Sequence, residues 1–88
     1  MSINGFEKIF KALANRRRLA ILVNLKRERE MTVGHIALRI KLSFTATSRH
    51  LVILERAGIL EKEQRNKEVF YRIAIPSQIF LGAFLASL

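Results

Sequence analysis

The sequence predicts a small, mainly α-helical domain that carries a single β-hairpin. Three observations predict this class. Apolar residues recur every three or four positions through the first two thirds of the chain. Two short runs of residues suited to strands follow Gly58 and flank a polar segment. The chain has 88 residues and no cysteine, which leaves room for one hydrophobic core and excludes a disulfide framework.

Two helices are expected in the first third of the chain. The first covers residues 6–13, where apolar side chains recur at Phe6, Ile9, Phe10 and Leu13. Asn15 can cap a second helix over about residues 16–27. Because apolar residues lie nearly all round this second helix, we expect it to be central in the fold.

A helix-turn-helix is expected over residues 32–57. Thr32 can cap a short helix, which ends before a turn at Lys41. Ser43 can cap the next and fourth helix, and Gly58 is suited to end it because glycine readily adopts a left-handed conformation.

A hairpin and a last helix complete the expected order. Residues 59–64 and 69–74 are expected to be strands joined through a polar four-residue segment. Pro76 suits the first turn of a last helix. Four helices, a hairpin and a helix in this order predict a winged helix-turn-helix, with residues 1–88 as a single domain and residues 59–74 as the wing.

The charge composition points to a polyanion as partner and argues against an enzyme. Sixteen Lys and Arg residues face seven acids, all of them Glu, so the formal net charge is +9. With no Asp, two His and four isolated Gly, the sequence offers no Ser-His-Asp triad, no His/Asp metal cage and no phosphate-binding loop. We therefore expect no catalytic residue, no cofactor and no metal site, and a basic surface that binds nucleic acid.

Two segments resemble the ArsR-type (arsenical-resistance repressor) winged-helix family. Residues 13–22 are similar to its opening pattern Leu-Ala-Asp/Asn-Pro-Thr-Arg-Leu-x-Ile-Leu, with Arg16 and Arg17 in place of Pro-Thr. Residues 43–51, Ser-Phe-Thr-Ala-Thr-Ser-Arg-His-Leu, are similar to its recognition-helix pattern Ser-Gln-Ser/Thr-x-Val-Ser-Arg-His-Leu. The resemblance covers about residues 6–73. It implies that the fourth helix binds DNA and that the first and last helices form a homodimer.

The outward face of the fourth helix carries residues suited to DNA contacts. Arg49 can reach guanine O6 and N7 with two hydrogen bonds. Thr45 and Ser48 can bond base edges or phosphates, and Thr45 or Ala46 can contact the methyl group of thymine. The resemblance implies roles for His50 and for the wing tip as well. The candidate DNA-binding residues are Ser43, Thr45, Ala46, Ser48, Arg49, His50, Arg65 and Lys67.

Alternatives stay open for this set. A polar face is also what any solvated surface helix presents. For His50, the resemblance implies a contact with the DNA backbone or a base, whereas the alternative is a partly buried histidine at the edge of the helix. Helical spacing places Phe44 on the inner side of the fourth helix, together with Thr47, Leu51 and Leu54.

The two terminal segments, residues 1–14 and 76–88, are the candidate dimerisation helices. The resemblance implies this role, and an apolar stripe on the last helix needs a partner. The candidate interface consists of Phe6, Ile9, Phe10, Phe80, Leu81, Phe84, Leu85 and Leu88. The alternative is that these side chains fill the core of the single chain.

Three departures from the family pattern bear on function. The sensing Cys-x-Cys segment is replaced by Glu-Met-Thr-Val-Gly-His at residues 30–35, and the last helix has no ionisable side chain, so metal sensing at the family sites is not expected. Lys41 stands where the family usually has Gly, so either a left-handed Lys costs about 1 kcal/mol or the turn differs. The cluster at residues 16–18 can contact phosphates, or Arg18 can pair within the fold.

These observations predict a sequence-specific regulator of transcription that binds double-stranded DNA as a homodimer at a palindromic site, most simply as a repressor. The uncharged residues 73–88 are fewer than the roughly 20 that span a membrane, so we expect no membrane partner and a cytoplasmic, nucleoid-associated protein. Two alternatives are a basic protein that coats DNA with low specificity and a winged-helix module that binds another protein.

Overall fold

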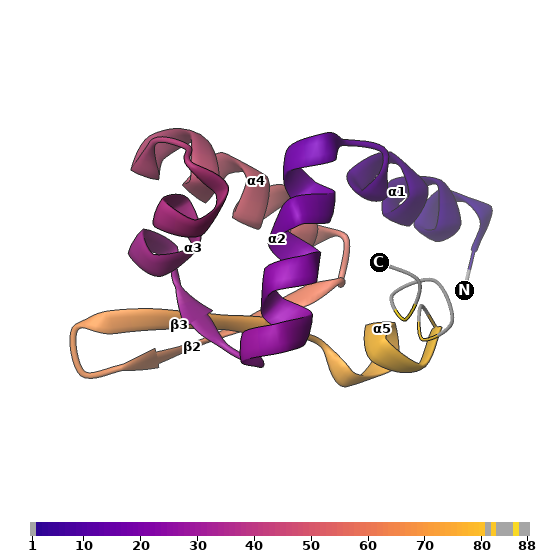
Figure 1. The fold of residues 1–88 in the computed structure, drawn as a ribbon. Helices are drawn as coiled ribbons and strands as arrows, with labels where there is room; N and C mark the ends of the chain where they lie inside the picture. The colour runs from indigo at the N-terminus through magenta and orange to yellow at the C-terminus, as the bar shows by residue number, and fades with distance from the viewer. Residues whose placement is uncertain (1, 81, 83–85, 87–88) are drawn as a thin grey trace.

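The computed structural model describes residues 2–80, 82 and 86, apart from the side chain of Phe80. Figure 1 shows the element order of a winged helix-turn-helix, as predicted. The elements are α1 (Ile3–Leu13), α2 (Arg16–Glu28), β1 (Met31–Thr32), α3 (Val33–Ile40), α4 (Phe44–Arg56), β2 (Leu60–Arg65), β3 (Glu68–Ile73) and α5 (Ile75–Phe80).

The sheet has three antiparallel strands in the order β1-β3-β2, whereas the sequence predicts two. The added strand β1 is two residues long and places Met31 opposite Tyr71 and Thr32 opposite Phe70. A strand this short has no alternating pattern by which it could be found. The two hairpin strands lie one residue nearer the turn than the predicted ranges 59–64 and 69–74, so that their last pair joins Arg65 and Glu68 and leaves a two-residue turn.

The predicted helix caps are confirmed. The side-chain oxygens of Asn15, Thr32 and Ser43 each accept a hydrogen bond from the backbone N–H three residues further on, at 3.1 to 3.2 Å. Gly58 follows α4 with a φ of 77°, the left-handed conformation expected there. Lys41 is also left-handed, at φ 56° and ψ 51°, so the turn keeps the geometry that favours glycine.

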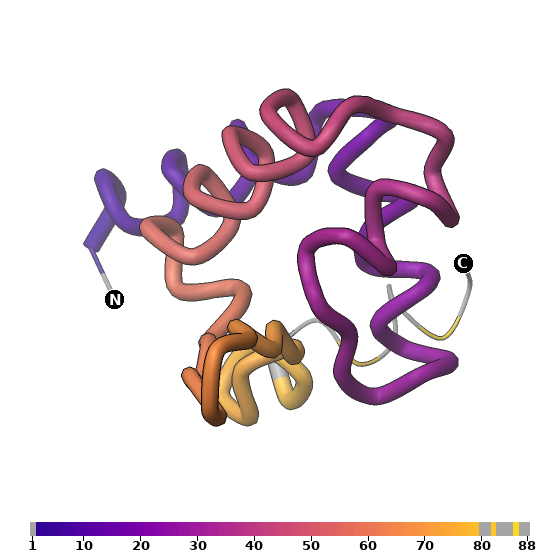
Figure 2. Tube along the Cα trace, turned by 90° about the vertical axis from the view of Figure 1, so that its left-hand side faces the viewer, coloured from indigo at the N-terminus to yellow at the C-terminus, as the bar shows by residue number. Residues whose placement is uncertain are grey.

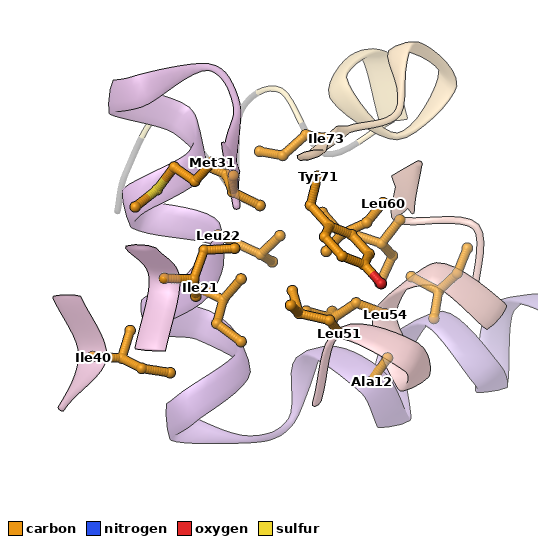
Figure 3. Close-up of a cluster of buried hydrophobic side chains, with 14 residues drawn as sticks. Ala12, Ile21, Leu22, Met31, Ile40, Leu51, Leu54, Leu60, Tyr71 and Ile73 are labelled. Carbon is orange, nitrogen blue, oxygen red and sulfur yellow. The ribbon is translucent and has the colours of Figure 1, made fainter. Parts of the chain in front are cut away.

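The core lies between α2, the sheet and the inner sides of the other helices (Figure 3). Ile21, Leu22 and Leu25 of α2 are at most 1% exposed, which confirms the central position predicted for this helix. Leu51 and Leu54 of α4 are fully buried against them. Packing against α1, α2 and α3 therefore fixes the orientation of α4.

Candidate nucleic-acid interface

The second helix of the helix-turn-helix, α4, stands at the surface next to α3 (Figure 2). The left-handed Lys41 turns the chain between the two helices, and the backbone N–H of Leu42 donates to the carbonyl of Ala37 at 3.0 Å. Thr45 and Arg49 are exposed on α4, and Ser48 is half-buried beside them. The outward face predicted for this helix therefore does reach solvent.

Phe44 lies outside the core, so its predicted place on the inner side of α4 is wrong. Its side chain is 61% exposed, whereas Thr47, Leu51 and Leu54 are fully buried. The helical spacing is correct, but Phe44 is the first residue of α4 and the core beneath the helix begins one turn later, at Thr47. The candidate interface consequently carries an exposed aromatic ring that the helical spacing did not predict.

Ion pairs remove several of the basic residues from the set available to a polyanion. Six of the seven glutamates lie within 4.0 Å of a Lys or Arg nitrogen. Among the described residues, the cations without an acidic partner around α4 and the wing are Lys41, Arg49, Arg56 and Lys67.

The two basic residues predicted at the wing tip differ in their surroundings. Arg65 donates from Nη2 to Glu30 Oε1 at 2.6 Å, and its guanidinium lies 3.8 Å from the centroid of the Phe70 ring. Lys67 is exposed in the two-residue turn, and no ion pair holds it within the described chain. Lys67 is therefore the wing residue whose charge is available at the tip.

Arg72, further along β3, is also engaged. Its guanidinium donates to Glu61 at 2.7 Å and to Glu63 at 3.0 Å, and these two hydrogen bonds raise the pKa of Arg72 above its usual range. Away from the turn, the positive charge of Arg72 is therefore offset by two glutamates, in contrast to the charge of Lys67 at the tip.

Two of the three arginines at the start of α2, Arg17 and Arg18, donate hydrogen bonds within the fold, whereas Arg16 is exposed. Arg17 donates to the carbonyl of Ile40 at the C-terminal end of α3, at 3.0 Å. Arg18 donates to the carbonyls of Ala12 and Lys11 at the end of α1, at 2.6 and 3.3 Å. For Arg18, the sequence leaves open a contact with phosphate or a partner within the fold, and these hydrogen bonds support the second.

Arg18 also reaches His50 on α4, with 3.2 Å between Nη1 and His50 Nδ1. Because a guanidinium can only donate, Nδ1 accepts and the ring proton of neutral His50 is on Nε2. Burial lowers the pKa of His50, and the positive charges of Arg18 and then Arg17 lower it further. His50 is half-buried at the helix edge, where it is held in its neutral form.

The candidate dimer residues fall into three groups. Phe6 and Phe10 form a stacked pair on the outer side of α1, with ring centroids 6.4 Å apart, and Phe10 is 57% exposed. Ile9 instead belongs to the core of the chain at 5% exposure, so it does not share that surface. The remaining candidates, which lie outside the described residues and side chains, are Phe80, Leu81, Phe84, Leu85 and Leu88.

Within residues 2–80, 82 and 86, no three side chains of His, Cys, Asp or Glu gather in a way that could hold a metal ion. No helix in the same part of the chain is long and apolar enough to cross a membrane.

Comparisons with known proteins converge on one group of regulators. The family described as "Bacterial regulatory protein, arsR family" matches residues 15–62. The transcriptional activator HlyU of Vibrio cholerae is 39% identical over 66 residues, which are 75% of this chain and 60% of HlyU. The cadmium resistance transcriptional regulatory protein CadC of Listeria innocua is 38% identical over 72 residues, which are 82% of this chain and 58% of CadC. The chain thus spans about 60% of the length of these relatives.

Solved structures share the fold over nearly the whole chain. Reduced HlyU from Vibrio cholerae has a TM-score of 0.81 and 30% identity, and the match covers 96% of this chain and 88% of HlyU. The homodimeric winged helix-turn-helix DNA-binding domain of Mb0332 from Mycobacterium bovis, solved by NMR in solution, has a TM-score of 0.82 and 30% identity, with 97% and 80% covered.

Proposed function

This chain belongs to the arsR family of bacterial regulatory proteins, and on that premise we propose that it is a homodimeric regulator of transcription that binds double-stranded DNA sequence-specifically. The observation that carries the proposal is the exposed face of α4. It presents hydroxyl groups and Arg49 in the position of a recognition helix, next to cations that have no acidic partner among the described residues.

In the proposed complex, α4 enters the major groove and the wing tip lies along the flanking backbone. Arg49 reads guanine through O6 and N7, and Thr45, Ala46 and Ser48 meet neighbouring base edges. Ser43 Oγ accepts the Ala46 N–H at 3.1 Å, which leaves its hydroxyl hydrogen for a phosphate oxygen.

Three further residues contact the sugar-phosphate backbone in this proposal. Lys67 contributes its charge at the wing tip. The Nε2–H of His50 is a donor that is not used by Arg18. Arg65 can contact a phosphate only if its guanidinium leaves Glu30, so we assign it a smaller contribution to DNA affinity than Lys67.

The dimer is proposed to form through α1 and the C-terminal segment. Among the described side chains, the large exposed apolar ones are Ile3 and Phe10 on α1, with Phe6 stacked on Phe10, and Ile75 and Ile79 on α5. Covering this surface with a second copy removes it from water. The homodimeric state of the Mycobacterium bovis domain supports this arrangement. Ile9 contributes through the core and not by direct contact.

We propose repression by occupancy, in the cytoplasm on the nucleoid, because a dimer seated in two successive major grooves excludes other proteins from that DNA. We also propose that no metal ion acts at the family's sensing positions. The sequence supports this, since it has no cysteine and residues 30–35 offer no thiolate, only the carboxylate of Glu30, the thioether of Met31 and the imidazole of His35. Transcription in vitro from a bound promoter decides the sign of regulation, and DNA affinity measured with and without Zn²⁺ or Cd²⁺ decides metal sensing.

Selection of duplexes from a random pool tests the central claim. We expect two inverted half-sites whose centres lie about 10 base pairs, or 34 Å, apart. Equal affinity for selected and random duplexes would instead favour a DNA-coating protein. Failure to bind any duplex at low salt would favour the protein-interaction module.

A further inference from the structure

Apolar side chains are exposed on α4 among the groups that the proposed function uses. Phe44 is 61% exposed and Ile53 is 42% exposed, and together with Val52 they border one shallow surface depression. Thr45, Ser48 and Arg49 border the same depression. A helix face that only meets water is normally polar, so these apolar groups need an explanation.

Spacing arranges these six residues in two rows along the helix. Phe44, Ser48 and Val52 follow one another at four-residue intervals, and so do Thr45, Arg49 and Ile53. Each row begins with a group that can make an apolar contact, the Phe44 ring or the Thr45 methyl, continues with a polar group and ends with an apolar residue. The larger exposed apolar group, the Phe44 ring, is in the first turn of α4.

The core does not account for this surface. Thr47, Leu51 and Leu54 already cover the inner side of α4 and are fully buried. A second copy packed against the same surface would place two Arg49 side chains close together, and Arg49 has no acidic partner within the described chain. Like charges in a contact oppose association, whereas a polyanion is attracted.

We propose that Phe44, assisted by the Thr45 methyl, reads the C5 methyl group of thymine in the major groove. This inference rests on the proposed function and names the base that it selects. The C5 methyl of thymine is the apolar group that the base pairs present in the major groove, and Phe and the Thr methyl are both suited to contact it. The first residues of a recognition helix are those that meet base edges.

The geometry also locates this thymine relative to the guanine read by Arg49. Arg49 follows Phe44 by five residues, which is about 7.5 Å along the helix at a rise of about 1.5 Å per residue. Base pairs succeed one another about every 3.4 Å along the duplex. The thymine is therefore expected within about two base pairs of that guanine in each half-site.

Two parallel selections test this reading. One random duplex pool is synthesised with thymine and the other with deoxyuridine, which pairs identically but lacks the methyl group. From the first pool, the wild-type protein is expected to enrich duplexes with a thymine near the guanine. From the second pool, it is expected to enrich the guanine but to show no preference for uracil beside it. On the selected duplex, replacing that thymine by deoxyuridine is expected to weaken binding about fourfold for each methyl group in contact.

Protein variants tie the effect to the side chain. Phe44→Gln, which introduces the residue of the family pattern, is expected to lower the ratio of thymine to deoxyuridine affinities to the smaller value that the Thr45 methyl alone supports. Leu38→Gln is the matched control, because Leu38 is 79% exposed on α3 and its loss should leave that ratio unchanged. Both changes are at exposed sites, so both variants are expected to fold.

The outcomes separate this inference from the function on which it rests. If both pools yield the same motif, including uracil in place of thymine, or if Phe44→Gln keeps the full ratio, methyl reading by Phe44 is overturned while sequence-specific binding stands. If neither pool yields a motif, sequence-specific binding itself is overturned, and this inference with it.

Discussion

The buried hydroxyl of Thr47 is expected to lower the stability of the fold. Thr47 is fully buried beneath α4, and its Oγ1 has no hydrogen-bond partner among the described residues. The family pattern has Val at this position. The variant Thr47→Val replaces the hydroxyl by a methyl group of similar size and keeps the branched Cβ, so backbone and rotamer preferences change little.

The expected magnitude follows from the cost of burying an unpaired hydroxyl, which is about 1 to 3 kcal/mol in protein mutational data. We therefore expect Thr47→Val to raise the free energy of unfolding by about 1 to 3 kcal/mol. For a domain of this size, each kcal/mol raises the melting temperature by about 4 to 8 °C.

Urea unfolding followed by circular dichroism measures this gain. The midpoint should rise while the m-value stays constant, at one fixed chain concentration so that any dimer contributes equally. Thr45→Val is the matched control, because Thr45 lies two residues earlier on the same helix and is exposed. The control should change stability by less than about 0.5 kcal/mol. A neutral or destabilised Thr47→Val protein would refute the reasoning, since it would mean that the hydroxyl has a partner in solution.

Four other predictions follow from the turn, the helix edge and the interface. Lys41→Gly should stabilise the domain by about 1 kcal/mol in urea, because Lys41 is left-handed; a loss of stability would contradict this. The lowered pKa of His50 means that the unfolded chain takes up a proton more readily, so the free energy of unfolding should decrease as the pH falls through about 6.5, the pKa of an ordinary histidine. His50→Gln should make this decrease in stability with falling pH smaller. An unchanged pH profile would mean that other titrating groups cause the decrease. Arg49→Ala should cost about 1 to 3 kcal/mol at the selected duplex, and an equal loss on random DNA would contradict base reading. Lys67→Ala should weaken all duplexes alike and reduce the salt slope by about 1, whereas an unchanged slope would exclude a phosphate contact.

Features that depend on neighbouring residues could be predicted from the sequence. The caps at Asn15, Thr32 and Ser43 each involve atoms only three residues apart, and the left-handed Gly58 ends the helix directly before it. The central place of α2 follows from its own composition. For the same reason the sequence locates the exposed polar side of α4.

Features that need distant partners could not be predicted in this way. The short strand β1 exists because β3, forty residues later, offers it a free edge. The pair between Arg65 and Glu30 spans 35 residues, so the sequence alone gives no sign that this wing arginine is engaged. The exposure of Phe44 depends on where the core ends beneath α4, which is a property of the assembled helices.

The arginines at the start of α2 show why net charge alone misleads about where a polyanion binds. Cations at a helix N-terminus oppose the helix dipole, and in isolation Arg17 and Arg18 suggest an external anion. In the fold, the C-terminal ends of α1 and α3 are brought to the same place, and their carbonyls accept from these two guanidiniums. The negative ends of two helices thus offset the positive end of a third. Because Arg18 also contacts His50, this one side chain joins the end of α1, the proposed dimerisation helix, to α4, the helix proposed to read DNA.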